Sequence, residues 1–347
     1  MDNIYQPTVM DLFCGCGGLS LGFIQAGFDV KLGIDYWQDA ISTYTHTHSN
    51  SQGIVADLFL VTPEQICQQT NIKKVDVIIG GPPCQGFSIA GKRMIDDERN
   101  QLYKAFVDFV RFYQPKAFLM ENVPNMMSMG KGLIKKQITE DFEKLGYTVN
   151  SQILLASDFG VPQNRKRAFF VGFKNGTTFP FPAPTVQQYV TARQAISDLP
   201  DYSVIDGDAY PLSGSSPYQN LMREHSIGLF NHQITQHNDK TKEIIALVPD
   251  GGNYKSLPEH LRQTRNVNIA WTRLNSQKPS FTIDTGHRHH FHYEFNRVPT
   301  VRESARIQSF PDDFVFLGTK TSQYKQVGNA VPPMLAKALA LQIKEFL

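Results

Sequence analysis

One of the four cysteines, Cys84, stands in the loop Gly-Gly-Pro-Pro-Cys-Gln-Gly-Phe-Ser at 80–88, which follows an apolar run at 75–79. We call 80–88 the cysteine loop. Pro82 and Pro83 stiffen this loop, and its glycines leave the backbone open to close approach. Reactive groups of α/β enzymes lie at the ends of strands, and an accessible thiolate is a strong nucleophile. The pattern therefore predicts that the Cys84 thiol is presented rather than packed, whereas Cys67 lies in a segment typical of a packed cysteine.

A carboxylate follows the next predicted strand. Glu121-Asn122-Val123 ends the apolar run at 117–120, beside the strand that feeds the cysteine loop. In a closed, dry site such a carboxyl group could stay protonated and donate to a ring nitrogen. An isolated Glu-Asn pair is more typical of a helix cap. The pair therefore indicates a catalytic role only in combination with the other motifs of the chain.

A basic segment, Gln163-Asn164-Arg165-Lys166-Arg167, opens a further predicted strand. Alternate residues of a strand project from one side, so Gln163, Arg165 and Arg167 are expected to share a face. A charge run is ordinarily a solvated surface. Two arginines on one side also suit a phosphate or a polarised carbonyl oxygen.

A glycine-rich turn, Cys14-Gly15-Cys16-Gly17-Gly18, ends the first predicted strand and opens a helix. We call 14–18 the glycine loop. Asp35 follows Gly15 by 20 positions and ends the second predicted strand, where a carboxylate can hold both ribose hydroxyls. This pattern suits a dinucleotide as well as an adenosine-type cofactor, although Ser20 stands where a dinucleotide motif has its third glycine. The two cysteines of the loop are expected to pack, because two sulfurs cannot complete a zinc site.

The elements that would position these groups alternate between short apolar strands and amphipathic helices. Strands are expected at 8–13, 30–34, 75–79, 117–120, 152–156 and 167–173, and helices at 19–26, 39–45, 102–113, 301–309 and 332–347. This order predicts an α/β fold with a doubly wound, mostly parallel sheet. Proline and glycine residues become frequent after Phe173, which predicts a smaller loop-rich domain at 184–297. The segments 1–183 and 298–347 would then form one discontinuous catalytic domain.

Composition narrows the class of protein. The chain has 347 residues, a formal net charge of +2 and a pI of about 8.2, so any nucleic-acid surface must be a local patch. No apolar stretch reaches the roughly 18 residues of a membrane span, and the chain enters a strand too early for a signal peptide. Four cysteines without paired CxxC motifs argue against a disulfide framework or a structural zinc site. We expect a cytoplasmic protein with no membrane partner and no metal.

The ordered set of motifs resembles the DNA (cytosine-5)-methyltransferases of bacterial type II restriction-modification systems. The resemblance covers 8–173 and 298–345 and is carried by Asp-Leu-Phe-x-Gly-x-Gly-Gly, Pro-Pro-Cys-Gln, Glu-Asn-Val, Gln-x-Arg-x-Arg, Arg-Glu-Ser-Ala-Arg and Gly-Asn-Ala-Val-Pro-Pro, in the family's order. It implies the class I S-adenosylmethionine-dependent methyltransferase fold and methyl transfer to C5 of a flipped-out cytosine.

The resemblance assigns Cys84 as the nucleophile that attacks C6 of the ring, because a thiolate both adds and leaves readily. It implies that Glu121 binds the ring nitrogen N3 and the exocyclic amine of the cytosine. It also implies that Arg165 contacts the base oxygen or the thiolate region, while Gln163 and Arg167 shape the strand that carries Arg165. The segment from Ser88 to Arg99 would close over the site as a lid.

The implied methyl donor is S-adenosylmethionine, with S-adenosylhomocysteine as the product. Phe13 would stack on adenine, Asp35 would bind the ribose and Asp57 the adenine amine. The other residues that the resemblance places around the cofactor are Gly15, Gly17, Gly18, Tyr36, Pro83, Leu102, Asn329 and Val331. Many relatives have glutamate and tryptophan where this chain has Asp35 and Tyr36, and the shorter carboxylate can still bind a diol.

The region 184–297 corresponds to the family's target-recognition domain, which reads double-stranded DNA in the major groove. Expected DNA contacts are Gln85, Ser88, Arg99, Arg273 and Arg288. Four histidines at 287–292 could bind a metal, but a DNA-facing or a solvated loop is favoured because no sulfur or carboxylate ligand flanks them.

The resemblance also implies partners. We expect a monomer that protects host DNA from a cognate restriction endonuclease, which would be linked genetically rather than bound as a subunit. A tRNA cytosine-5 methyltransferase is the main alternative because the same pocket chemistry serves RNA. An NAD-dependent dehydrogenase would rest on the glycine loop and Asp35 alone, and would leave Cys84 and Glu121 without roles.

Overall fold

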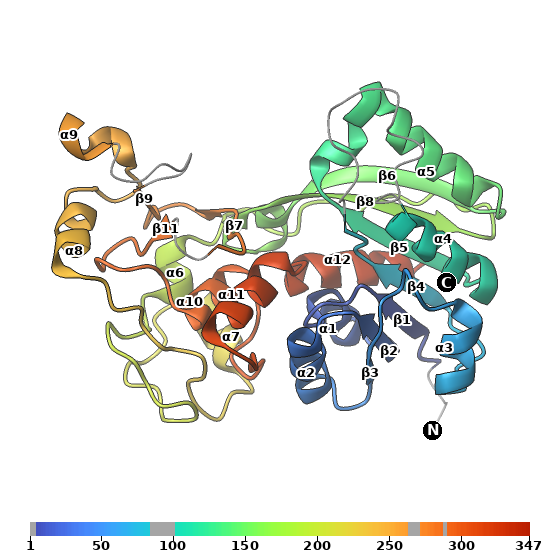
Figure 1. Cartoon of the computed structure of the whole chain (residues 1–347), viewed down its shortest axis with the longest axis horizontal. Coiled ribbons are helices and arrows are strands. Elements are labelled where there is room, and N and C mark those ends of the chain that lie inside the picture. The colour runs from blue at the N-terminus through green and yellow to red at the C-terminus, as the bar shows by residue number, and fades with distance from the viewer. Residues whose placement is uncertain (1–4, 84–100, 263–270, 287–289) are drawn as a thin grey trace. The chain divides into compact units, whose positions relative to one another are not determined.

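The computed structural model describes residues 5–83, 101–262, 271–286 and 290–347 (Figure 1). The chain divides into two compact units. The first unit comprises Met1–Leu155, Lys166–Ala183 and Leu335–Leu347, and the second comprises Ala156–Arg165 and Pro184–Met334.

A seven-stranded sheet organises the first unit. Its order is β3-β2-β1-β4-β5-β8-β6, and β8 runs antiparallel to the other six strands. The strands are β1 (Thr8–Leu12), β2 (Asp29–Asp35), β3 (Gln52–Val55), β4 (Val77–Gly80), β5 (Ala117–Asn122), β6 (Thr148–Leu155) and β8 (Lys166–Phe173). This sheet confirms the predicted doubly wound, mostly parallel α/β fold.

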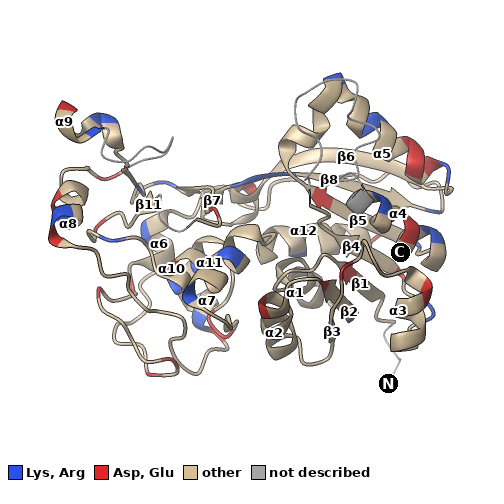
Figure 2. Cartoon of the chain, viewed as in Figure 1, with Lys and Arg blue, Asp and Glu red and all other residues tan. Residues whose placement is uncertain are grey.

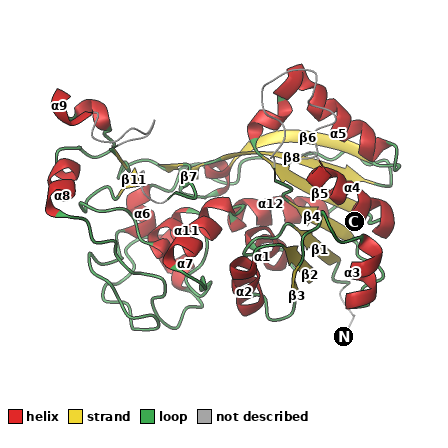
Figure 3. Cartoon of the chain, in the orientation of Figure 1, coloured by secondary structure: helices red, strands yellow, loops and turns green. Residues whose placement is uncertain are grey.

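Helices flank the sheet on both faces (Figure 3). The helices of this unit are α1 (Gly18–Gln25), α2 (Gln38–Thr47), α3 (Pro63–Thr70), α4 (Gln101–Tyr113), α5 (Leu133–Glu143) and, from Leu335 onward, α12 (Pro333–Lys344). Helix α1 packs so tightly on α12 that a Cβ on Gly22 would lie 2.3 Å from that of Ala336.

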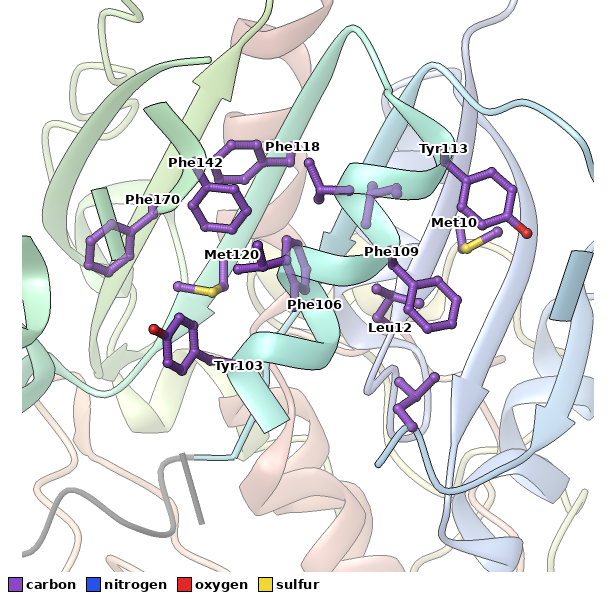
Figure 4. Close-up of a cluster of buried hydrophobic side chains, with 14 of the residues drawn as sticks. Met10, Leu12, Tyr103, Phe106, Phe109, Tyr113, Phe118, Met120, Phe142 and Phe170 are labelled. Carbon is purple, nitrogen blue, oxygen red and sulfur yellow. The ribbon is translucent and has the colours of Figure 1, made fainter. Parts of the chain in front are cut away.

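Strand register explains which side chains face which helices. Met10, Ile78 and Phe118 are register partners across β1, β4 and β5, and all three are fully buried in one apolar cluster. Figure 4 shows this cluster, in which Phe106 and Phe109 of α4 face the strands. Burying a large apolar side chain contributes about 1.5–3 kcal/mol, so the cluster fixes the strand ends that carry the candidate site.

The second unit is built mainly from loops and short elements. Its helices are α6 (Ala192–Ile196), α7 (Pro217–Arg223), α8 (Asp239–Ala246), α9 (Glu259–Arg262), α10 (Val301–Ile307) and α11 (Lys320–Asn329). Its strands are two-residue pairs, β7 (Gln163–Asn164) with β10 (Ser280–Phe281) and β9 (Thr272–Arg273) with β11 (His290–Phe291). Short 3-10 helices span Pro124–Met127, Met129–Gly132, Ala156–Phe159 and Tyr254–Ser256 in the two units.

A buried ionic network ties α10 into the second unit. Arg306 is fully buried between Asp198 and Asp312, and Arg297 donates to both carboxylate oxygens of Glu303 at 2.8 Å. The compact units differ from the predicted domains, because 298–334 groups with the second unit rather than with the sheet. The segment 156–165 also leaves the first unit, whereas the division at 183/184 lies where the prolines predict it.

Both basic and acidic residues occur on α5 and on α8 (Figure 2). Neither helix is therefore a wholly basic surface. Among the described residues, no helix combines the length and the apolar character that crossing a bilayer requires.

Candidate active site

The glycine loop lies at the carboxyl end of β1 and is held by the end of β2. Asp35 Oδ2 accepts a 2.9 Å hydrogen bond from the Gly15 N–H, and Oδ1 accepts one of 2.9 Å from the Trp37 N–H. Among the described residues, no atom lies within 4 Å of a Cβ built on Gly15, so this side of the loop is open with respect to them. The loop is thus fixed from one side and accessible from the other.

The predicted cofactor residues of β1, β2 and β3 share one edge of the sheet. Phe13 adopts the left-handed conformation, with φ of 59°, directly after β1. Asp35 is nearly buried, and burial raises the pKa of its carboxyl group. Asp57 is exposed just after β3 and caps the next turn by accepting from the Phe59 N–H, while Tyr36 is 70% exposed.

Strand β5 holds the first residues of the cysteine loop, 80–83, which we call its stem. Asn122 Nδ2 donates a 2.9 Å hydrogen bond to the Pro82 carbonyl, and Glu121 Oε2 would lie 2.9 Å from a Cβ on Gly81. Glycine at 81 therefore allows the carboxylate to approach the backbone three residues before Cys84. Sequence reasoning did not single out Asn122, although it stands inside the Glu-Asn-Val motif. Cys84 itself lies outside the described residues.

Glu121 has a basic partner on the neighbouring strand. Arg167 Nε lies 2.8 Å from Glu121 Oε1, and the two side chains are only 16% and 13% exposed. The antiparallel pairing of β5 with β8 places these residues near each other. Because a charged hydrogen bond has a preferred direction, Arg167 orients the carboxylate that faces the cysteine loop.

Gln163 and Arg165 do not share a strand face with Arg167, contrary to the prediction. The strand is interrupted at Arg165, because β7 pairs with β10 in the second unit while β8 joins the sheet. Gln163 Nε2 donates to the Ile307 carbonyl at 3.3 Å, and its Oε1 accepts from the Ile283 N–H at 2.9 Å. The buried Arg165 guanidinium donates to the carbonyls of Ile283 and Gly328 at 3.1 and 2.8 Å.

The prediction that Arg273 contacts DNA is corrected by its surroundings. Arg273 is 4% exposed, and its guanidinium donates to backbone carbonyls, including those of Val248 at 2.8 Å and Ile245 at 2.7 Å. A buried guanidinium satisfied in this way is a structural crosslink of the domain.

Several predicted site residues cannot be placed with the others. Cys84, Gln85, Ser88, Arg99 and Arg288 fall outside the described residues, as do His287 and His289. Gly18 begins α1 and Pro83 ends the described stem of the cysteine loop, while Leu102 is described only as a backbone position of α4. Asn329, exposed at the end of α11, and the buried Val331 belong to the second unit.

His292, the last of the four clustered histidines, is part of a packed core. It is fully buried and stacks on Phe295, with ring centroids 4.5 Å apart, and its Nδ1 accepts from the N–H groups of Glu294 and Phe295. Within the described ranges, no three His, Cys, Asp or Glu side chains group as metal ligands would.

Comparison with known proteins identifies the family. The profile described as C-5 cytosine-specific DNA methylase matches residues 7–345. This chain belongs to that family. The methylase is 42% identical over 336 residues to the type II methyltransferase M1.HphI of Haemophilus parahaemolyticus, covering 96% of this chain and 85% of the relative. It is 39% identical to M.DdeI of Desulfomicrobium norvegicum over 369 residues, covering 97% and 88%.

A solved structure agrees with the whole fold of the methylase. A prophage-encoded E. coli protein described as a DNA modification methyltransferase superposes with a TM-score of 0.81 at 30% identity, covering 98% of this chain and 99% of that one. Family membership confirms the predicted enzyme class and rules out the dehydrogenase alternative. It also implies S-adenosylmethionine as the methyl donor and DNA as the substrate.

The sheet edge of this methylase fits that methyl donor. The open side of Gly15 leaves room for the donor, and the carboxylate oxygens of Asp35 keep lone pairs beyond their backbone contacts. Asp57 offers a further acceptor at the end of the adjacent strand. An adenosine with a ribose diol and an exocyclic amine matches these acceptors.

Proposed function

We propose that this enzyme methylates C5 of a cytosine within a specific short sequence of duplex DNA, with Cys84 as the nucleophile. The observation that carries the proposal is the contact of Glu121 and Asn122 with Gly81 and Pro82. A carboxylate and a hydrogen-bond donor thus brace the backbone that leads directly to a cysteine.

The chemistry explains why these residue types are needed. Cytosine C5 is a poor nucleophile, and addition of the Cys84 thiolate to C6 moves an electron pair onto C5. S-adenosylmethionine, when bound, supplies an electrophilic methyl group and leaves as S-adenosylhomocysteine. Loss of the C5 proton to water and expulsion of the thiolate from C6 then restore the aromatic ring. Because the ring cannot be reached inside a duplex, the target base must be flipped out.

Glu121 stabilises the charge that develops on the ring during thiolate addition. Its proposed partners are N3 and the exocyclic amine, and Arg167 holds its Oε1 at 2.8 Å. Preorganised groups of this kind stabilise a transition state without a cost of reorganisation during the reaction. The proposal that Arg165 contacts the base oxygen or the thiolate region stays a prediction.

The glycine loop, Asp35 and Asp57 form the proposed binding site for the methyl donor. Asp35 would accept from the ribose hydroxyls while it holds Gly15, and Asp57 would accept from the adenine amine. Phe13 would face the adenine from the end of β1. These roles require a fixed loop, which the backbone contacts of Asp35 supply.

The region 184–297 is proposed to read the DNA sequence, and the methylation is proposed to protect host DNA from a cognate endonuclease. The loop-rich structure of this region suits a surface that varies with the DNA sequence to be read. If host protection is the role, DNA from cells that express the enzyme will resist one sequence-specific nuclease and will be cut when the Cys84→Ala variant replaces it.

Transfer of labelled methyl groups tests the activity and the substrate together. The purified protein is incubated with labelled S-adenosylmethionine and either a mixed duplex DNA library or total tRNA. We expect label in C5-methylcytosine of DNA at one sequence context, and loss of that label in Cys84→Ala. Label in tRNA alone would replace the DNA proposal with the tRNA alternative, and full activity of Cys84→Ala would overturn the mechanism.

A further inference from the structure

His48 lies directly beneath the glycine loop, although it is 31 residues away in the sequence. It caps the C-terminus of α2, is 2% exposed and stacks on Tyr44 with ring centroids 4.3 Å apart and an interplanar angle of 10°. Its Nε2 atom lies 3.2 Å from the carbonyl oxygen of Gly17. A residue of another helix therefore reaches the loop that the methyl donor is proposed to occupy.

Gly17 is shaped to receive this ring. Its φ of 94° is left-handed, and a Cβ at this position would lie 2.3 Å from His48 Cε1. The absence of a side chain at Gly17 thus allows the imidazole to approach the backbone. The contact between His48 and Gly17 therefore depends on the residue type at both positions.

Two carbonyl groups compete for the proton of the His48 ring. Burial lowers the pKa of His48 to about 4, so the ring is neutral at physiological pH and carries one N–H. The Gly17 carbonyl lies 3.2 Å from Nε2 and the Tyr44 carbonyl lies 3.0 Å from Nδ1, and a neutral ring can donate to only one of them. The Thr47 hydroxyl, 2.9 Å from Nδ1 and 2.8 Å from the Thr43 carbonyl, is a donor that Nδ1 can share when the proton is on Nε2. A hydrogen bond from His48 to Gly17 needs this Nε2–H tautomer.

Hydrogen bonds and packing fix the ring of Tyr44, which stacks on His48. The Tyr44 hydroxyl lies 2.7 Å from Ser51 Oγ and 3.3 Å from Ser20 Oγ, and Ser20 in turn donates to Asp11 Oδ2 at 2.6 Å. The ring of Tyr44 also fills the space over Gly33, where a Cβ would lie 2.3 Å from Cζ. The support beneath the loop is therefore itself hydrogen-bonded to β1 and α1.

We propose that His48 is a positioning residue that holds Gly17 and thereby preorganises the glycine loop for S-adenosylmethionine. Asp35 holds the loop at the Gly15 N–H and His48 holds it at the Gly17 carbonyl, while the side of Gly15 stays open. His48 sets cofactor affinity without touching the cofactor. This inference rests on the proposed function only in taking the loop as the cofactor site.

Two substitutions separate the hydrogen bond from the packing. His48→Phe keeps a flat ring against Tyr44 but has no N–H, whereas His48→Gln keeps an N–H donor and loses the stacked ring. A single hydrogen bond contributes about 1 kcal/mol, so His48→Phe should raise the Kd for S-adenosylhomocysteine by about fivefold. The Kd is measured by calorimetry on the full chain without DNA, and His48→Gln should restore most of the affinity.

The kinetic readout distinguishes positioning from general loss of structure. The KM for S-adenosylmethionine should rise in His48→Phe while kcat at saturating donor changes less than KM. A wild-type Kd in His48→Phe, or equal weakening by both substitutions, would overturn the proposal. Absence of S-adenosylhomocysteine binding by the wild-type protein would instead overturn the proposed function.

A spectroscopic measurement covers the case in which His48→Phe does not fold. In the wild-type protein, the ring nitrogen and carbon shifts of labelled histidine report the tautomer, and comparison with His48→Gln assigns the signal. We expect a neutral ring with the proton on Nε2 at pH 7.5. A proton on Nδ1, or a charged ring at that pH, would contradict the proposed contact with Gly17.

Discussion

The carboxylate of Asp35, at the end of β2, accepts a 2.9 Å hydrogen bond from the backbone N–H of Gly15, twenty residues earlier in the chain. This bond joins the two pieces of the proposed cofactor site. Asp35→Asn removes the charge while nearly keeping the shape. Because hydrogen bonds to charged groups contribute about 1.5–3 kcal/mol, we predict a Kd for S-adenosylhomocysteine that is at least about tenfold higher, measured by calorimetry. Asp39→Asn, at a partly exposed position in the first turn of α2, is the matched control and should bind normally.

Asn122 supplies a different prediction, since it supports the cysteine loop rather than the cofactor site. Asn122→Asp removes the donor to the Pro82 carbonyl while keeping the size of the side chain. We predict that kcat for DNA methylation falls about tenfold, because the stem that carries Cys84 loses its anchor, and that cofactor affinity is unchanged. Asn125→Asp, at an exposed position three residues further along the chain in the 3-10 helix Pro124–Met127, should leave kcat near wild type. Equal kcat in Asn122→Asp and the wild type would remove Asn122 from the account.

The Glu121–Arg167 pair is tested by a double-mutant cycle. If Arg167 acts by orienting Glu121, then Arg167→Ala lowers kcat in the wild type but has little further effect in Glu121→Gln. The coupling should be about 0.5–3 kcal/mol, the range found for residues in contact. Lys166→Ala, an exposed neighbour on the same strand, serves as the control. Independent effects of the two substitutions would show that Arg167 acts elsewhere.

The buried carboxyl group of Asp11 predicts a pH dependence of stability. Burial raises the pKa of Asp11 to about 8, and Oδ1 has no hydrogen-bond partner in the part of the chain that the structure describes. The folded state therefore keeps a proton that the unfolded state releases near pH 4, so the contribution of Asp11 to stability falls as the pH rises from about 4 to about 8. Each pH unit within that window changes stability by about 1.4 kcal/mol for one proton.

Asp11→Asn tests this linkage because the amide cannot ionise and its oxygen can still accept from Ser20. Relative to the wild type, the free energy of unfolding of Asp11→Asn should increase between pH 5 and pH 8, as measured by urea denaturation. Asp39→Asn should show no such trend. A difference between Asp11→Asn and the wild type that is constant with pH would mean that Asp11 is ionised in the folded protein.

The sequence predicted the sheet and the two loops at its edge because local signals determine both. Apolar runs define β1, β2, β4 and β5, and glycine or proline marks the loop that follows β1 or β4. The placement of Gln163 and Arg165 could not be predicted in this way. The two-residue period holds only within one strand, and the break at Arg165 depends on pairing between Gln163 and Ser280, which are far apart in the sequence.

Arg273 and His48 also show that tertiary contacts of polar side chains could not be predicted from the sequence. Arg273 is in a segment rich in polar residues and was expected at the DNA. It is instead buried among carbonyl groups at the C-terminal end of α8 and just after β11. His48 carries no motif, and its role depends on the tertiary contact with Gly17. Polar side chains that satisfy backbone groups in a loop-rich domain leave no periodic signal in the sequence.

The central claim is that Cys84 forms the covalent bond to the target cytosine, and a trapping experiment tests it most directly. A mixed duplex library carrying 5-fluorocytosine is incubated with the protein and S-adenosylmethionine, because fluorine at C5 blocks the final loss of a proton. Digestion and mass spectrometry then locate any protein–DNA adduct. We predict a stable adduct on the peptide that contains Cys84, and none with Cys84→Ala. Methylation of normal DNA by the same preparation with no adduct at Cys84, or an adduct at another residue, would contradict the account.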